Sequence, residues 1–107
     1  MKAYFTKVEE IDRERAKAGK LYREFLRIPA MSAGLYVLPA GGTDPQRPHH
    51  EDEMYYVIRG RARFRAGDED AEVSAGSALF VAAEVEHRFY DITEDLAVLV
   101  FFAPAES

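Results

Sequence analysis

The chain has 107 residues and no cysteine, with 48% hydrophobic residues, 31% charged residues and a net charge of -5. This balance is typical of one folded domain with its own core, and it excludes a disordered chain, a disulfide framework and thiolate metal ligands. The acidic charge, without a separate basic cluster, argues against nucleic-acid binding.

The opening segment gives no sign of export. Charged residues interrupt the segment that follows Met1, so it is not typical of a signal peptide. The longest apolar run, residues 96–104, is too short to cross a bilayer. We therefore expect a cytoplasmic protein that does not bind membranes.

The first predicted element is a short helix over about residues 6–19. Thr6 and Glu9 have the spacing of a capping box, in which each side chain bonds the other residue's backbone amide. Gly19 is well placed to end the helix. We expect a flap packed on a larger β body, with a solvated tether as the alternative. Its thin apolar face comprises Val8, Ile11 and Ala18.

From residue 21 onward, short β-favouring runs alternate with turn signals, which is typical of an all-β sandwich or barrel. Gly60 is expected to end one strand, and the tail after residue 102 is expected to fray. About eight strands are predicted, at residues 21–28, 32–38, 54–59, 61–66, 71–73, 78–81, 87–90 and 96–102.

The predicted strand at residues 61–66 alternates apolar residues with arginines. This pattern indicates one core face and one solvated face. Nearby acidic residues would offset the arginines, so we expect a solvated stripe. An anionic ligand on that face is the alternative.

Chemistry-bearing side chains gather just before the central strand. His49, His50 and Glu53 follow a loop rich in glycine and proline, and His87 begins a later β-like run. Imidazole nitrogen and carboxylate oxygen together suit zinc, iron, nickel or manganese, so a divalent-metal site is the first hypothesis. The fold must bring the two distant segments together.

The spacing of these residues resembles the first motif of the cupin family. His49 is followed after three residues by Glu53, and Glu53 after six more by Gly60. The family's first histidine is missing, and its position is Arg47. The second motif is similar in spacing, with Gly76 at its start and His87 as its histidine. The family's proline, glycine and asparagine are replaced there by Ala82, Glu84 and Asp91.

The resemblance covers about residues 30–102 and is to small single-domain cupins of the conserved-barrel type. It implies that residues 1–107 form one cupin domain, with the helical flap at about 6–19 and the barrel at about 21–102. The implied fold is an all-β double-stranded β-helix, a jelly-roll barrel of the RmlC-like kind, whose mouth holds the metal.

The resemblance further implies that His49, Glu53 and His87 bind one divalent metal ion per chain, either Fe, Mn, Ni or Zn. Two histidines and one carboxylate with open positions form the facial-triad pattern of non-haem iron oxygenases. Arg47 cannot be a ligand, since its guanidinium stays protonated. The alternative is that these three are ordinary surface or capped groups.

Four further side chains are candidates for an additional ligand or for the pocket: Gln46, Arg47, His50 and Tyr55. Gln46 could offer its amide oxygen as a fourth ligand, whereas strand alternation directs His50 outward. Tyr55 is expected mainly in the core, with a hydrogen bond to a substrate as the alternative. Arg47 either turns outward to a carboxylate or points inward, which would imply an anionic substrate.

The function implied by the resemblance is that of a metal-binding cupin acting on a small molecule, as a dioxygenase or as an isomerase or epimerase. The alternative is a non-catalytic module that binds or senses a small ligand. We also expect a homodimer, because the early strands carry apolar residues on both faces. These residues are Tyr22, Phe25, Leu26, Ile28, Leu35, Tyr36, Val37 and Leu38.

Overall fold

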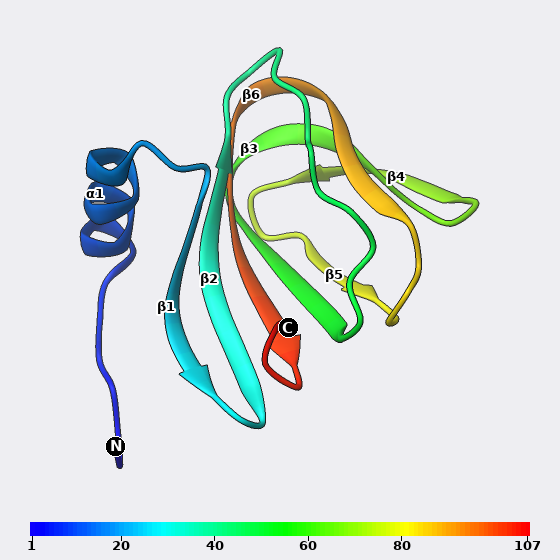
Figure 1. Ribbon diagram of the computed structural model, residues 1–107. Helices are drawn as coiled ribbons and strands as arrows, with labels where there is room; N and C mark the ends of the chain where they lie inside the picture. The colour runs from blue at the N-terminus through cyan, green and yellow to red at the C-terminus, as the bar shows by residue number, and fades with distance from the viewer.

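Six strands pair into one antiparallel sheet that curls around a core, with a helix on its outer side, in the computed structural model, which describes residues 1–107 (Figure 1). The strand order is β1-β2-β6-β3-β4, and β5 pairs with β3. The all-β fold with a short N-terminal helix, predicted from the sequence, is confirmed. The elements are α1 (Val8–Ala18), β1 (Tyr22–Ile28), β2 (Met31–Leu38), β3 (Asp52–Ala66), β4 (Glu69–Ser74), β5 (Ala78–Val81) and β6 (His87–Ala103).

Two long strands, β3 and β6, run through the centre of the sheet, so the prediction of eight short strands is wrong. Gly60 lies inside β3 and does not end it. Its φ of 101° is in the left-handed region, and a Cβ there would lie 2.4 Å from the Asp95 carbonyl oxygen. The register with β6 shifts between Val57 and Arg63. The glycine therefore lets the strand bend tightly where a turn was expected.

The core lies inside the curled sheet, because alternation along each strand points every second side chain inward. Strands β2 to β6 all contribute to this core. The strands β3 and β6, which carry candidate site residues, are therefore held in place by packing. The core residues are Tyr36, Leu38, Tyr55, Val57, Ala62, Phe64, Val73, Val81, Phe89, Ile92, Leu96, Val98, Val100 and Phe102.

Helix α1 packs on the outer face of the sheet through Ile11, which is buried against Leu35 and Ala97. Gly19 ends the helix in the left-handed conformation, as expected from the sequence. The capping box is wrong. Lys7 occupies the N-cap position, so Glu9 stands one residue too early to close the box with Thr6. The chain has no helix long and apolar enough to span a membrane.

The arginines of β3 that alternate with core residues form an exposed and paired stripe. Arg61 contacts Glu72, and Arg63 and Arg65 both contact Asp70. These pairs match the solvated face expected from the sequence.

The tail after β6 does not fray as predicted. Residues 104–107, which we call the strap, lie back across the sheet near β1 and β2. The Glu106 amide donates to Ser32 Oγ at 2.9 Å, and Arg27 donates to the Glu106 carbonyl at 2.6 Å. The Ser107 amide donates to the buried Glu51 carboxylate at 3.1 Å. Contacts with three separate segments hold the strap in place.

Candidate metal centre

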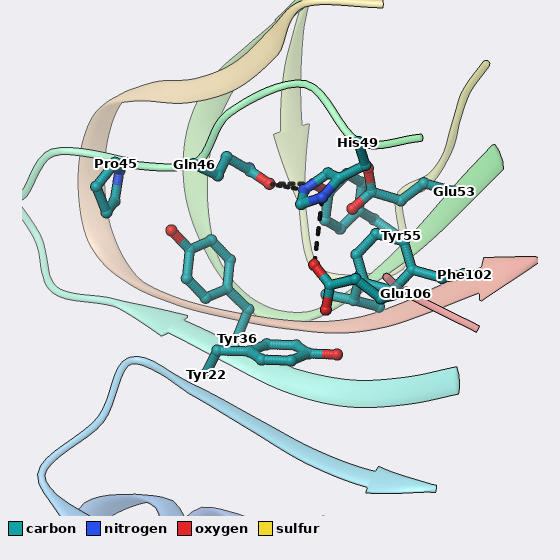
Figure 2. A pocket seen from close by; sticks show the side chains of 10 residues that line it. Tyr22, Tyr36, Pro45, Gln46, His49, Glu53, Tyr55, Phe102 and Glu106 are labelled. Atoms are coloured by element: carbon teal, nitrogen blue, oxygen red, sulfur yellow. Dashed lines mark hydrogen bonds and ion pairs between the residues drawn. The ribbon is translucent and has the colours of Figure 1, made fainter. Parts of the chain in front are cut away.

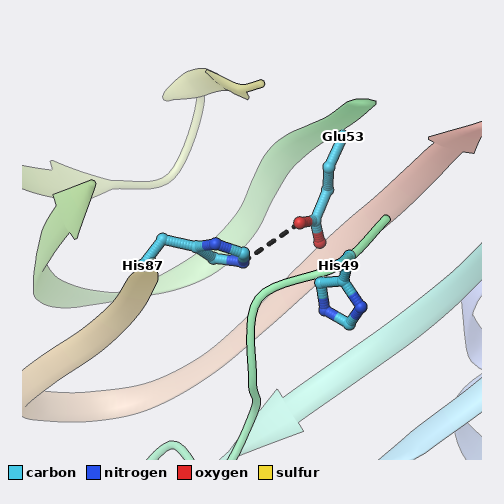
Figure 3. Close-up of side chains that lie close together, drawn as sticks. All are labelled: His49, Glu53 and His87. Atoms are coloured by element: carbon cyan, nitrogen blue, oxygen red, sulfur yellow. Dashed lines mark ion pairs between the residues drawn. The ribbon is translucent and has the colours of Figure 1, made fainter. Parts of the chain in front are cut away.

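His49, Glu53 and His87 meet at one point although they come from three segments (Figure 3). His49 lies in the loop before β3, Glu53 near the start of β3, and His87 at the start of β6. One ligand atom from each lies within 4.8 Å of the others. The Glu84 amide donates to the His49 carbonyl at 2.7 Å and so ties that loop to the segment before β6. The structure therefore brings together the three predicted ligands.

Glu53 is the most constrained member of this group. Its backbone pairs with Val81 of β5 on one side and with Phe102 of β6 on the other. Its side chain is only 1% exposed, and neither carboxylate oxygen has a hydrogen-bond partner. His87 Nε2 lies 3.0 Å from Oε1, a distance typical of an ion pair. A carboxylate buried in this way needs a proton or a cation beside it.

His87 presents its Nε2 atom to Glu53. Its Nδ1 atom lies 2.8 Å from the Val85 carbonyl oxygen, which can only accept, so Nδ1 carries a hydrogen. Burial lowers the pKa of His87, but the nearby Glu53 carboxylate and the hydrogen bond to the Val85 carbonyl outweigh that effect and leave the pKa above its ordinary 6.5. Without a metal, a proton on Nε2 would compensate the Glu53 carboxylate, and the raised pKa favours that protonated form. A metal ion at this point would take the place of that proton.

His49 has polar neighbours at both ring nitrogens (Figure 2). Nδ1 lies 3.2 Å from Glu106 Oε2, and Nε2 lies 3.4 Å from Gln46 Oε1. The bond to Glu106 raises the pKa of His49 above 6.5, against the opposing effect of burial. The ring packs edge-on against Phe102, with 4.8 Å between the ring centroids.

Gln46 faces the candidate centre, and its amide orientation is fixed. Nε2 donates to Asp44 Oδ2 at 2.6 Å, which leaves Oε1 to accept from the Tyr55 hydroxyl at 2.9 Å. Asp44 is itself buried and accepts from the Tyr36 hydroxyl and from the Phe89 amide. Sequence reasoning missed Asp44, because Asp-Pro is also an ordinary turn signal.

Tyr55 lies at the centre as well as in the core. Its hydroxyl is 3.1 Å from His87 Nε2 in addition to its bond to Gln46. Burial is the main reason that its pKa lies well above the ordinary 10.0, so the phenol keeps its proton and acts as a donor. The expected place of this residue in the core is found, and a hydrogen bond to a substrate stays a prediction.

Arg47 and His50 lie outside this group. Arg47 is exposed and lines a second hollow together with Arg65, Arg88 and His87, so its side chain lies outside the group of three candidate ligands. None of the expected carboxylates pairs with it. The physical reason is that the bonds of Gln46 turn that side chain inward, one position earlier in the chain. His50 is exposed and pairs with Glu84 at 2.7 Å.

A cavity of about 190 Å³ opens beside His49 and Glu53 (Figure 2). The sequence predicted four of its ten lining residues as site residues, and Tyr22 and Glu106 are among those it missed. The Tyr22 ring lies across Gly34, where a Cβ would come within 2.2 Å of it, and its buried hydroxyl has no partner. The lining residues are Tyr22, Tyr36, Pro45, Gln46, His49, Glu53, Tyr55, Val100, Phe102 and Glu106.

Comparison with known proteins identifies the family. A family model described as a cupin domain matches residues 34–102, which is more than half of the chain. The chain belongs to the cupin family. This cupin is 49% identical to an uncharacterised protein of Streptomyces coelicolor over 107 residues, the full length of both chains.

Solved structures agree with this cupin fold. TT1209 from Thermus thermophilus has a TM-score of 0.75 and 23% identity, over 96% of this chain and 99% of that one. The DMSP lyase DddQ from Ruegeria pomeroyi has a TM-score of 0.69 and 18% identity, over 82% of this chain. This cupin spans only 49% of that lyase. At such identities the likeness establishes the fold alone.

Proposed function

We propose that this cupin is a metal-dependent enzyme for a small molecule, with one divalent transition-metal ion held by His49, Glu53 and His87. The supporting observation is the buried Glu53 carboxylate, whose two oxygens have no hydrogen-bond partner and lie beside two imidazoles. Two nitrogens and one oxygen fit iron, manganese, nickel or zinc. When bound, such an ion would supply Lewis-acid or redox chemistry at its open positions.

The residues around the triad prepare it for that role. The Val85 carbonyl orients His87 so that its free nitrogen faces Glu53. Tyr55 remains a phenol, and its one hydroxyl hydrogen, donated here to Gln46 Oε1, would have to turn from Gln46 to a substrate oxygen to act in a reaction. The Gln46 amide oxygen lies 3.4 Å from His49 Nε2 and could serve as a further metal ligand. The DMSP lyase DddQ, whose fold is similar, is an example of an enzyme with this fold.

The second candidate is a non-catalytic cupin that binds or senses a small ligand. The cavity favours it, because it is small and half of its lining residues are hydrophobic. Dioxygen uptake by the iron-loaded protein, with small acids, phenols and diketones as substrates, separates the two. Uptake with any of these compounds supports the enzyme, and binding without turnover supports the binder.

The metal site itself is tested by elemental analysis of matched histidine variants. The parent should bind one divalent ion per chain, and His49→Ala should lose it. His50→Ala is the matched control, because the neighbouring imidazole is exposed and outside the site. Equal metal content in parent and His49→Ala would show that the ligand assignment is wrong.

A further inference from the structure

The strap places a second carboxylate at the candidate metal centre. Glu106 lines the cavity, and its Oε2 atom lies 3.2 Å from His49 Nδ1 (Figure 2). The backbone of Glu106 is fixed at both its amide and its carbonyl, by Ser32 and Arg27. This carboxylate is thus held in the site by the fold and is not a freely moving surface group.

The carboxylates that line the cavity have no lysine or arginine beside them in its wall. The lining residues include two carboxylates, Glu53 and Glu106, and neither lysine nor arginine. A divalent ion with Glu53 would carry one net positive charge, and Glu106 would cancel it. An anionic ligand would then gain no net attraction from this centre, and the Glu106 carboxylate would repel it at short range, partly shielded from water.

A neutral ligand, by contrast, finds complementary groups. The Tyr22 hydroxyl is buried without a partner and can donate to a ligand oxygen or nitrogen. Glu106 can accept from a ligand hydroxyl or N–H group. Tyr36 and Phe102 supply apolar surface between them.

We propose that Glu106 determines the specificity of this site, so that the cavity takes small uncharged molecules with hydroxyl, carbonyl or N–H groups and rejects carboxylates and other anions. The inference rests on the proposed metal-binding function, because the charge of the ion enters the balance. It makes the strap a part of the binding site.

The test compares an anionic and a neutral ligand on the Co²⁺-loaded protein, with azide and imidazole as probes and visible absorption as the readout. Glu106→Gln removes the charge and keeps an oxygen acceptor for His49 Nδ1. We expect azide affinity to rise about tenfold in this variant, while imidazole affinity stays the same, because only the anion senses the lost charge.

Glu84→Gln is the matched control, since it removes the same charge from another carboxylate that pairs with a histidine, on the surface. It should bind both probes as the parent does. Equal azide affinity in parent and Glu106→Gln, with Co²⁺ bound to both, would overturn this inference and leave the metal site intact. Loss of Co²⁺ from Glu106→Gln would also overturn it, because Glu106 would then support His49. Failure of the parent to bind Co²⁺ would overturn both proposals.

Discussion

At the scale of single residues, Glu53 is the group whose environment differs most from water. Its side chain is 1% exposed, and neither oxygen accepts a hydrogen bond. Such a carboxylate destabilises the fold unless a cation compensates it. The stability of the protein should therefore depend on what occupies the space between Glu53 and the two imidazoles.

The first prediction concerns Glu53→Gln, which keeps the shape and removes the charge. At a pH where both histidines are neutral, the metal-free variant should be more stable than the metal-free parent by about 1–3 kcal/mol, the cost of an uncompensated buried polar group. Added metal should stabilise the parent and leave the variant unchanged. Chemical denaturation with and without metal measures both. A metal-free variant less stable than the parent would contradict the prediction.

The second prediction concerns pH. The pKa of His87 is raised in the folded protein, so protonation favours folding. This contribution is complete below the ordinary value of 6.5 and is lost as the pH rises through the higher folded value. The metal-free protein should therefore melt at a higher temperature at about pH 6 than at about pH 8. The metal-loaded protein should show the opposite order, because protons compete with the ion for the histidines at the lower pH. Thermal melts with chelator and with metal check this.

At the scale of elements, β3 and β6 approach each other closely at Gly60. Each of these strands carries a candidate metal ligand. The bend in β3 is at Gly60, whose φ is 101°. A Cβ there would lie 2.4 Å from a backbone oxygen, which cannot move aside as a flexible side chain can.

The third prediction follows from this contact. Gly60→Ala should destabilise the protein by about 3 kcal/mol or more, because it adds a backbone clash to the strain of positive φ. Gly19→Ala is the control, with a φ of 69° and open space around the added Cβ, and it should cost about 1 kcal/mol. Urea denaturation of both variants measures the difference. Equal losses would mean that the contact with Asp95 has no effect.

The sequence predicts those parts of the site that lie on paired strands. Glu53 and His87 sit at the starts of β3 and β6, where motif spacing and strand alternation apply. The loop before β3 has no such periodicity, so the sequence leaves the direction of Arg47 open, and only the hydrogen bonds in the structure show that Gln46 is the residue that faces the centre. Glu106 lies in a tail with the composition of a frayed end, and only three-dimensional contacts hold it.

At the scale of the whole molecule, most of the apolar side chains that suggested a dimer have intramolecular partners. Tyr36 and Leu38 lie in the barrel core, and Leu35 lies beneath α1. Exposed apolar surface is found instead on β3 and β5. Met54 and Tyr56 are each 47% exposed, and Phe80, the register partner of Met54, is 62% exposed.

The fourth prediction is that this cupin forms a homodimer through the outer face of β3 and β5, which would cover these side chains. Phe80→Glu should then shift the sedimentation mass from two chains to one, because dimerisation would bury an unpaired charge. Phe5→Glu serves as the control, since Phe5 is 92% exposed on a different segment. A parent mass of one chain at micromolar concentration would contradict the proposal.

The bond from the Phe89 amide to Asp44 provides a way to measure motion of the loop before β3. That amide donates at 2.9 Å to a side chain of the loop before β3, and the same carboxylate orients Gln46. Whenever the loop lifts away, the Phe89 amide is exposed to solvent and can exchange its hydrogen. The deuterium exchange rate of this one amide therefore reports how often the loop leaves the barrel, in the free protein and without any substrate.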